Sequence, residues 1–579
     1  MTYLRTHVGR FSWLGKLVIL VISAWLLTIV LSINQIRKNS TFNTPETDKT
    51  DQDDTQNLME ISKAFQTLKQ QNIDLQNNQI WKKKLDASED QVHLFFQELM
   101  NNSSNIFKLK HEKIDFLSEP SMKYEEMRSK IQNILQEMWF FINSELSLLQ
   151  KKVQDETLKN DIKDTLEELS EYKKYLLIDI KDLSESDGYN SWRKNEITEL
   201  STLVQQRFRN LQNPVDCDNA RKLICNINKG CGFGCQIHHL VYCFLVAYGT
   251  KRTLILKSKG WRYQKDGWES VFQPLSNTCL SANGQTHSNW PGDENTQVVI
   301  LPIVDNVFPK PIFQPPSVPS DLAERLRKVH NYPLVWWIGQ VLKYLMRPTI
   351  ETKMLLSEKE EKMKFTKPIV GVHVRRTDKV GTEAAFHDVD EYMLKVEEYF
   401  NNLKNPPEKR RIYLASDDPK VIITARQRYP NYEIIADTDI AQTASIARRY
   451  SNLSLQGIIM DIHFLSLCDH IVCTFSSQVC RVAYELMQTY SIDASNKFTS
   501  LDDIYYYGGQ NPNPQIVIYN HVPRKKGEIE LKFNDKIEVY GNHWNGYSKG
   551  RNLRTGVVGL FPSYKVVNVV KAVDFPKYD

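Results

Sequence analysis

The sequence HVRRTDKVGTEAAFH at residues 373–387 combines the groups that a reaction with a phosphate leaving group requires. The apolar residues 369–372 before it predict a buried strand, and ligands bind at strand ends in open α/β sheets. Arginine presents a fork of donors that fits a diphosphate, lysine adds a point charge, and a carboxylate can take a proton from an attacking hydroxyl. The segment carries these groups as Arg375, Arg376, Asp378, Lys379 and Glu383.

An isolated RRxDK run is more often a salt-bridged turn after a core strand. Here all fifteen residues match, without a gap, the signature of the eukaryotic α1,6-fucosyltransferases that modify the N-glycan core. The chain resembles that family strongly over residues 213–519 and weakly before them. The resemblance implies inverting transfer of L-fucose from GDP-β-L-fucose to O6 of the reducing-end N-acetylglucosamine of an N-glycan. Asp388 is a local departure, since the family commonly has proline there.

The resemblance also implies how the charged segment acts. Glu383 would be the base on O6, while Lys379 and Arg375 would hold the diphosphate as charge builds on it. The family resembles metal-independent enzymes in which arginine does the work of a divalent ion. We therefore expect no cofactor and no metal, only the donor substrate GDP-fucose and the N-glycan acceptor.

Two further regions are expected to bind the nucleotide. A carboxylate can accept two hydrogen bonds from guanine, and the resemblance implies that Asp461 and His373 contact the base, although a lone Asp before a helix is more often an N-cap. Ser477 and Gln478 follow a predicted strand and open an apparent helix, where hydroxyls and backbone N–H groups can bind diphosphate. An ordinary serine cap is the alternative.

Aspartate pairs raise the question of a metal. Asp417 and Asp418 end a predicted strand at residues 412–415; we expect them to position Arg375 or Arg376, or to contact sugar. The DxD matches at residues 388–390 and 437–439 lie in polar stretches and are weak signals.

The glycine-rich residues 228–235 precede a helical pattern and could bring backbone N–H groups close to phosphate, or could form a disulfide-tied turn. The resemblance places Lys229 and Asp305 on the acceptor side of the site. It places Tyr263 on the nucleotide side.

The 579-residue chain is long enough for two to four domains, and its net charge of +5 is too small to suggest a nucleic-acid binder. Residues 17–33 form one long apolar run, about 25 Å as a helix. Flanking basic residues favour a cytoplasmic N-terminus. A cleaved signal peptide is the less favoured alternative. We therefore expect a single-pass type II protein of the Golgi membrane with a lumenal catalytic part.

Eight of the nine cysteines are expected to form disulfides, because clustered cysteines in a chain that enters an oxidising compartment usually pair. Zinc is the competitor at Cys231 and Cys235, but no second compact pair faces them. Spacing alone does not decide the connectivity. The resemblance implies the pairs Cys217–Cys279, Cys225–Cys243, Cys231–Cys235 and Cys473–Cys480, with Cys468 left over.

Apolar residues at intervals of three and four between 131 and 153 predict a long amphipathic helix. A coiled coil that forms a homodimer is the favoured interpretation. The alternative is a helical hairpin that packs on its own catalytic domain.

Alternating strand and helix patterns after residue 213 predict two α/β parts, and closely spaced strands after Pro514 predict a small β module. Its GLFPSY run resembles the signature of SH3 domains, but Arg524, Lys525 and Lys526 replace their acidic loop. We therefore expect it to dock glycan or protein and not proline motifs. The expected organisation is a GT-B-like glycosyltransferase with a cytoplasmic tail (1–16), a transmembrane anchor (17–33), a flexible stem (34–57), a helical coiled-coil stem (58–212), an open-sheet α/β part (213–366), a Rossmann-like GDP-fucose-binding part (367–513) and an SH3-like barrel (514–579).

Two rival functions stay open at this point. A protein O-fucosyltransferase would use a related arginine strand, but the helical stem and the SH3-like module argue against it. A non-catalytic, membrane-tethered SH3 scaffold would explain both ends of the chain but not the charged segment.

Overall fold

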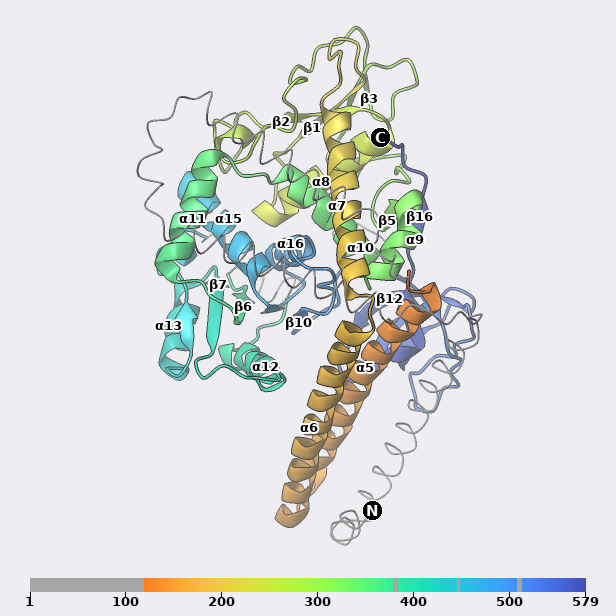
Figure 1. Cartoon of the computed structure of the whole chain (residues 1–579), viewed down its shortest axis with the longest axis vertical. Coiled ribbons are helices and arrows are strands. Elements are labelled where there is room, and N and C mark those ends of the chain that lie inside the picture. Colours follow the sequence, from red (N-terminus) through yellow and green to blue (C-terminus); the bar gives the residue numbers. More distant parts are fainter. Residues whose placement is uncertain (1–118, 378–380, 382–383, 445–447, 508–512, 579) are drawn as a thin grey trace, which may run out of the picture. The chain divides into compact units, whose positions relative to one another are not determined.

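The structure is a computed structural model that describes residues 119–377, 381, 384–444, 448–507 and 513–578 (Figure 1). All of them belong to the second of the two units into which the chain divides, Leu117–Asp579. The expected tail, membrane anchor and flexible stem, and residues 58–118 of the expected helical stem, lie outside the described residues.

A parallel sheet of four short strands organises the first α/β part, in the order β2-β1-β4-β3. Helix α8 (Phe233–Gly249) connects β1 to β2 and is buried along nearly its whole length, as expected for a crossover that covers a sheet face. The strands and the other helices of this part are β1 (Lys222–Asn226), β2 (Thr253–Lys257), β3 (His287–Asn289), β4 (Val298–Ile300), β5 (Ser317–Pro319), α9 (Ser320–Val329), α10 (Pro333–Leu345) and α11 (Ile350–Met363).

The second α/β part holds a five-stranded parallel sheet in the order β10-β9-β6-β7-β8. Its central strand β6 is buried at every position, because helices cover both faces. Its elements are β6 (Ile369–Val374), α12 (Val389–Asn401), β7 (Arg411–Ser416), α13 (Pro419–Arg428), β8 (Glu433–Ile435), α14 (Thr438–Thr443), α15 (Asn452–Leu467), β9 (His470–Cys473), α16 (Gln478–Met487) and β10 (Phe498–Ser500). The predicted architecture of two α/β parts is confirmed.

Helix α16 joins the two α/β parts, because it packs against α8 and α10 of the first part. The backbone oxygen of Glu485 lies 2.3 Å from the position that a Cβ atom would take at Gly339, so this crossing requires glycine. Across the same contact, Nε2 of His238 lies 2.9 Å from the buried carboxylate of Glu485. The two sheets are therefore held by one shared helix.

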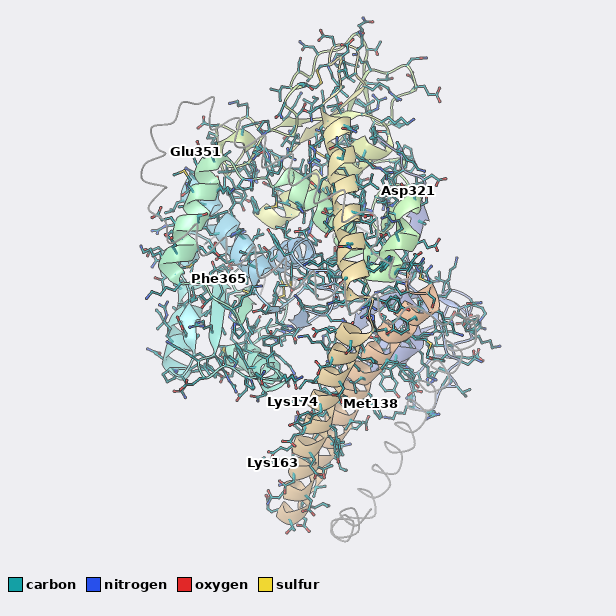
Figure 2. All side chains as sticks on the ribbon, viewed as in Figure 1. Met138, Lys163, Lys174, Asp321, Glu351 and Phe365 are labelled. Carbon is teal, nitrogen blue, oxygen red and sulfur yellow. A yellow bond between two sulfur atoms is a disulfide. The ribbon has the colours of Figure 1, made fainter. Side chains whose placement is uncertain are left out.

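The helical region contains α5 (Met122–Lys152), α6 (Glu156–Ser186) and α7 (Asn190–Gln212). Helices α5 and α6 pack against each other as a hairpin in one chain, the alternative that the sequence left open; Figure 2 labels Met138 on α5 and Lys174 on α6. Of the periodic apolar residues, Leu135 is buried but Leu149 is 41% exposed. The hairpin thus leaves apolar surface uncovered, and dimerisation stays a prediction.

The C-terminal module is a five-stranded antiparallel sheet in the order β14-β13-β12-β11-β15, as the SH3-like signature predicted. Helix α5 contacts it through two ring pairs, Phe140 with Trp544 and Phe141 with Tyr547. The strands are β11 (Asn513–Val517), β12 (Lys536–Asn542), β13 (Tyr547–Asn552), β14 (Val558–Pro562) and β15 (Val566–Asn568), and β16 (Lys571–Val573) returns to pair with β5.

All four expected disulfides are present: Cys217–Cys279, Cys225–Cys243, Cys231–Cys235 and Cys473–Cys480. Cys468 is buried and unbridged, as expected for the cysteine left over.

The prediction of a single-pass membrane protein needs correction. In the described part of the chain, no helix is both long enough and apolar enough to cross a membrane. A span needs about 20 consecutive apolar residues, whereas the apolar helices α8 and α10 have 17 and 13 residues. The longer helices α5 and α6 are amphipathic and charged.

Candidate functional site

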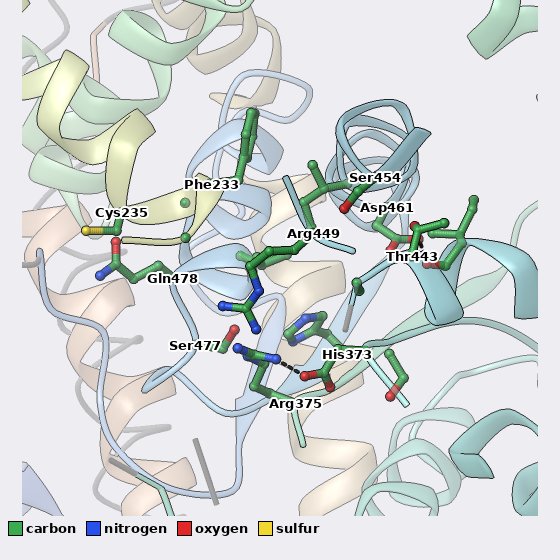
Figure 3. Close-up of a pocket in the computed structure, with 18 of the residues that line it drawn as sticks. Phe233, Cys235, His373, Arg375, Thr443, Arg449, Ser454, Asp461, Ser477 and Gln478 are labelled. Carbon is green, nitrogen blue, oxygen red and sulfur yellow. Dashed lines mark hydrogen bonds and ion pairs between the residues drawn. The ribbon is translucent and has the colours of Figure 1, made fainter. Parts of the chain in front are cut away.

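A cavity of about 260 Å³ lies at the carboxyl ends of β6, β7 and β9, opposite the glycine-rich loop that follows β1 (Figure 3). Residues 231–235 form one wall, and residues 476–479 with parts of α14 and α15 form the others. Parallel strands bring their carboxyl ends to the same edge of a sheet, which is where open α/β folds place ligands.

Arg375 and Arg376 are adjacent in sequence but lie in different environments. Arg375 lines the cavity and forms an ion pair with Asp417 (Figure 3). The guanidinium of Arg376 instead stacks 4.1 Å from the centre of the Phe386 ring. Successive side chains leave a strand on opposite faces, so only one of the two arginines presents its charge to the cavity.

Asp417 fixes the strand end that carries Arg375. Its carboxylate accepts a hydrogen bond from the backbone N–H of Arg376 at 2.7 Å and another from the hydroxyl of Thr377. The register of the sheet explains this, because Val374 at the end of β6 pairs with Ser416 at the end of β7. Asp418 has a different role: it caps α13 by accepting from the backbone N–H of Lys420 at 2.9 Å.

Two buried titratable groups, Asp461 and His373, also line the cavity. Burial raises the pKa of the Asp461 carboxyl to about 7, and the hydroxyl of Tyr413 donates to it at 2.8 Å. Burial, together with the charge of Arg375, lowers the pKa of His373 to about 3, so its imidazole is neutral. Nδ1 of His373 is buried and has no hydrogen-bond partner among the described residues. An unpaired buried nitrogen is costly, and a ligand atom in the cavity would relieve that cost.

The start of α16 forms a third wall of the cavity. Ser477 is its N-cap residue, and Ser477 and Gln478 line the cavity, as Figure 3 shows. A Cβ atom at Gly234 would lie 2.9 Å from the backbone of Gln478, so the glycine-rich loop can approach the helix only without a side chain there. Nδ1 of His238 lies 3.2 Å from Oε1 of Gln478 and anchors it. A helix N-terminus with backbone N–H groups and hydroxyls is suited to an anion.

Lys229 and Asp305, both expected on the acceptor side, are brought together at 2.7 Å by the loops after β1 and β4. Tyr263, expected on the nucleotide side, lines the cavity and is buried between the rings of Phe233 and Tyr450. Of these three residues, only Tyr263 lines the cavity, and the acceptor-side role of Lys229 and Asp305 stays a prediction.

The remaining expected residues are Asp378, Lys379 and Glu383, and all three lie outside the described residues. Both DxD matches contain helix caps: Asp388 caps α12 in a capping box with Glu391, and Asp437 caps α14. The carboxylate of Asp388 accepts from the backbone N–H of Asp390 at 3.2 Å, as an N-cap residue does.

Arg449 is a cavity residue that sequence reasoning missed. It lines the cavity, and its side chain points toward Arg375 in Figure 3. Arg448 and Arg449 form a second pair of adjacent arginines just before α15. This pair resembles Arg375 and Arg376 and could have indicated a second cation for the diphosphate. The sequence offered no reason to select Tyr413, which donates a hydrogen bond to Asp461, because a tyrosine inside a strand is usually a core residue.

One group of side chains in the described residues has metal-ligand proximity: Cys225, His239 and Cys243. The two cysteines are bonded to each other as a disulfide. A disulfide sulfur is not a thiolate, and the thiolate is the form that binds metal, so this group is not suited to an ion.

Comparison with known proteins identifies relatives over most of the chain. A family model described as the N- and catalytic domains of alpha-(1,6)-fucosyltransferase matches residues 5–506, and a variant SH3 domain model matches residues 517–567. An alpha-(1,6)-fucosyltransferase of Drosophila melanogaster is 53% identical over 79% of this chain and 75% of its own. One from Caenorhabditis elegans is 39% identical over 88% of this chain and 91% of its own.

Solved structures give weaker likenesses. The NodZ alpha-1,6-fucosyltransferase soaked with GDP-fucose is 13% identical and covers 46% of this chain and 92% of its own, with a TM-score of 0.32. POFUT1 in complex with GDP-fucose is 11% identical and covers 50% of this chain and 99% of its own, with a TM-score of 0.28. At such TM-scores these likenesses carry no weight for the ligand of this chain.

Proposed function

Because the chain belongs to the alpha-(1,6)-fucosyltransferase family, we propose that this fucosyltransferase moves L-fucose from GDP-β-L-fucose to O6 of the core N-acetylglucosamine of N-glycans, with inversion. The observation that carries the proposal is the ion pair of Arg375 and Asp417 at a strand end, in one cavity with neutral His373 and buried Asp461. This combination offers a cation for a diphosphate beside hydrogen-bonding groups for a base.

The guanine end of the donor would lie against His373 and Asp461. A carboxylate can accept two hydrogen bonds from guanine N–H groups, and Asp461 is buried beside the cavity with one oxygen already held by Tyr413. The unpaired Nδ1 of His373 gives the base a further partner. Tyr263, whose ring borders the same cavity, would pack on the nucleotide.

The diphosphate would lie between Arg375 and the start of α16. Asp417 holds the guanidinium in place before the donor binds, so no reorganisation is needed as charge grows on the leaving group. Ser477 and Gln478 would add hydroxyl and backbone donors at the helix N-terminus. Lys379 would add a second cation. We propose that these cations make a divalent metal unnecessary.

Glu383 would accept the proton from O6 of the acceptor as that oxygen attacks the anomeric carbon of fucose. The C–O bond to the β-phosphate breaks on the opposite face, and GDP leaves with the negative charge. Lys229 and Asp305 would hold the acceptor sugar, because they form an ion pair and Lys229 lies two residues before Cys231 of the cavity wall.

The proposal is tested by mass spectrometry of a core N-glycopeptide incubated with the enzyme and GDP-fucose. One deoxyhexose should be added to the reducing-end N-acetylglucosamine, and excess EDTA should leave the rate unchanged. Addition to a peptide hydroxyl would instead favour the protein O-fucosyltransferase function. Loss of activity in EDTA, restored by manganese, would refute the metal-independent mechanism.

We also propose that the helical region dimerises. Leu148, Leu149 and Leu158 near the turn of the α5–α6 hairpin are between 41% and 48% exposed. A second hairpin that covered them would remove apolar surface from water. Sedimentation should show a dimer that Leu149→Glu dissociates, with Glu167→Lys on the polar surface of α6 as the control.

A further inference from the structure

We propose that the SH3-like domain positions the turn at residues 475–477, which we assign to the diphosphate, through a hydrogen bond from Trp544 to Asp502. This inference rests on the proposed function, because it takes that turn to contact the donor. It makes Trp544 a positioning residue of the active site, although Trp544 belongs to a different domain.

The carboxylate of Asp502 accepts hydrogen bonds from two backbone N–H groups of this turn. One oxygen of its carboxylate accepts from the backbone N–H of Phe475 at 2.7 Å, and the other accepts from that of Ser476 at 3.2 Å. The first oxygen also accepts from the hydroxyl of Ser500 at 2.9 Å. Charge-assisted bonds of this kind are strong and directional. The Asp502 carboxylate therefore holds two successive backbone N–H groups of the segment that leads into Ser477.

Trp544 holds Asp502 from the other side. Its indole N–H donates to the backbone oxygen of Asp502 at 2.9 Å. The residue has a φ of 53°, a left-handed conformation that bulky side chains rarely adopt. Two contacts hold it there: its backbone N–H donates to the Asn542 side chain at 2.9 Å, and Phe140 of α5 packs edge-on against its ring at 5.7 Å. The indole is thus fixed before it meets Asp502.

Asp503 and Ile504, which follow Asp502, also contact the SH3-like domain. A Cβ atom at Gly541 would lie 3.1 Å from Oδ1 of Asp503, so this strand of the SH3-like domain approaches the segment closely. Ile504 packs against the apolar core of the domain. Three consecutive residues, 502–504, therefore rest on the SH3-like domain, while the first of them also binds the turn.

Trp544→Phe tests the proposal, because it removes the N–H donor and keeps an aromatic ring against Phe140. Loss of a single hydrogen bond that positions the turn should weaken GDP binding about three- to tenfold, measured by calorimetry. The KM for GDP-fucose should rise by a similar factor. Asp502→Ala should weaken GDP binding at least as much.

Two control variants separate positioning from general destabilisation. Trp290→Phe removes another indole-to-carbonyl bond, to Pro309 at 2.8 Å, and should leave GDP affinity unchanged. Phe140→Leu loosens the packing of Trp544 on α5 without removing the N–H. It should lower the melting temperature and weaken GDP binding by less than Trp544→Phe does, because the N–H donor is still present.

A double-mutant cycle decides whether Trp544 acts through Asp502. In the Asp502→Ala background, Trp544→Phe should weaken GDP binding by less than a further twofold, since coupled residues are not additive. If Trp544→Phe does not fold, Gly541→Ala replaces it and should weaken GDP binding, because its methyl group would press on the carboxylate of Asp503, the neighbour of Asp502. A folded variant with wild-type GDP affinity, or fully additive effects, would overturn the proposal. Absence of GDP binding by the wild-type enzyme would instead overturn the proposed function.

Discussion

The four-stranded and the five-stranded parallel sheets share an architecture but differ in the residues that follow their carboxyl ends. The ends of β6, β7 and β9 are followed by Arg375, Asp417 and Ser477, all in one cavity. The end of β1 is followed by a glycine-rich loop that supplies backbone and the disulfide Cys231–Cys235. The five-stranded sheet therefore places charged side chains in the cavity, while the loop after β1 of the four-stranded sheet mainly forms a wall of the cavity.

From this difference we infer that a few residues after each strand, and not the sheet itself, set the chemistry of the site. The second sheet should control turnover and nucleotide affinity. The first sheet, with Lys229 and Asp305 on its loops, should affect the acceptor. Four measurements test this division of roles between the two sheets.

Glu383→Gln should have the largest effect, a loss of about 10²–10⁴ in kcat, because general-base catalysis contributes that much. GDP affinity should be unchanged, since the base acts only when O6 must lose a proton. A transfer assay and calorimetry on the same protein check both expectations. Near-normal turnover would move the base to Asp305 or to a water.

Arg375→Ala should lower kcat by about 10²–10³, the effect of removing one preorganised donor, and should also weaken GDP binding. Arg375→Lys should be impaired as well, because it keeps the charge but loses the fork. Arg411→Lys is the matched control, since Arg411 lies at the opposite end of the same sheet and pairs with Glu433. Equal losses in both lysine variants would refute a role specific to the strand end.

Nucleotide affinity should depend on pH through Asp461. Burial raises its pKa to about 7 in the empty site, and the guanine N–H groups require the carboxylate. Below pH 7 the Asp461 carboxyl must lose a proton before GDP can bind. The Kd for GDP should therefore rise about tenfold for each unit by which the pH falls. Calorimetry between pH 5.5 and 8 measures this slope. Asp461→Asn should bind weakly at every pH and show no such slope.

Lys229→Met should have the smallest effect, raising the KM for the glycan acceptor roughly three- to tenfold, as expected for a lost charged hydrogen bond. The KM for GDP-fucose should stay constant. If the donor KM changed instead, the first sheet would take part in nucleotide binding, and the division between the sheets would fail.

The sequence predicted the strand that carries Arg375 because apolar runs and charged strand ends are local patterns. The resemblance to the family singled out Arg375 for the diphosphate, but the local pattern does not separate it from Arg376, since the alternation of side chains assigns faces only once the cavity is known. It also could not find Tyr413, whose hydroxyl matters only because β7 lies beside α15. The DxD matches could not distinguish a metal site from a helix cap, because aspartate serves both purposes.

The sequence by itself determined the two α/β parts, the SH3-like module and the residues after β6, because periodicity and strand-end chemistry are written in neighbouring residues. The tertiary structure decided which of those residues meet. The parallel register of β6 with β7 brings Asp417 to Arg375 across 42 positions of the chain. Packing of the last domain brings Trp544 to Asp502. Contacts between elements depend on register and packing, which no local pattern encodes.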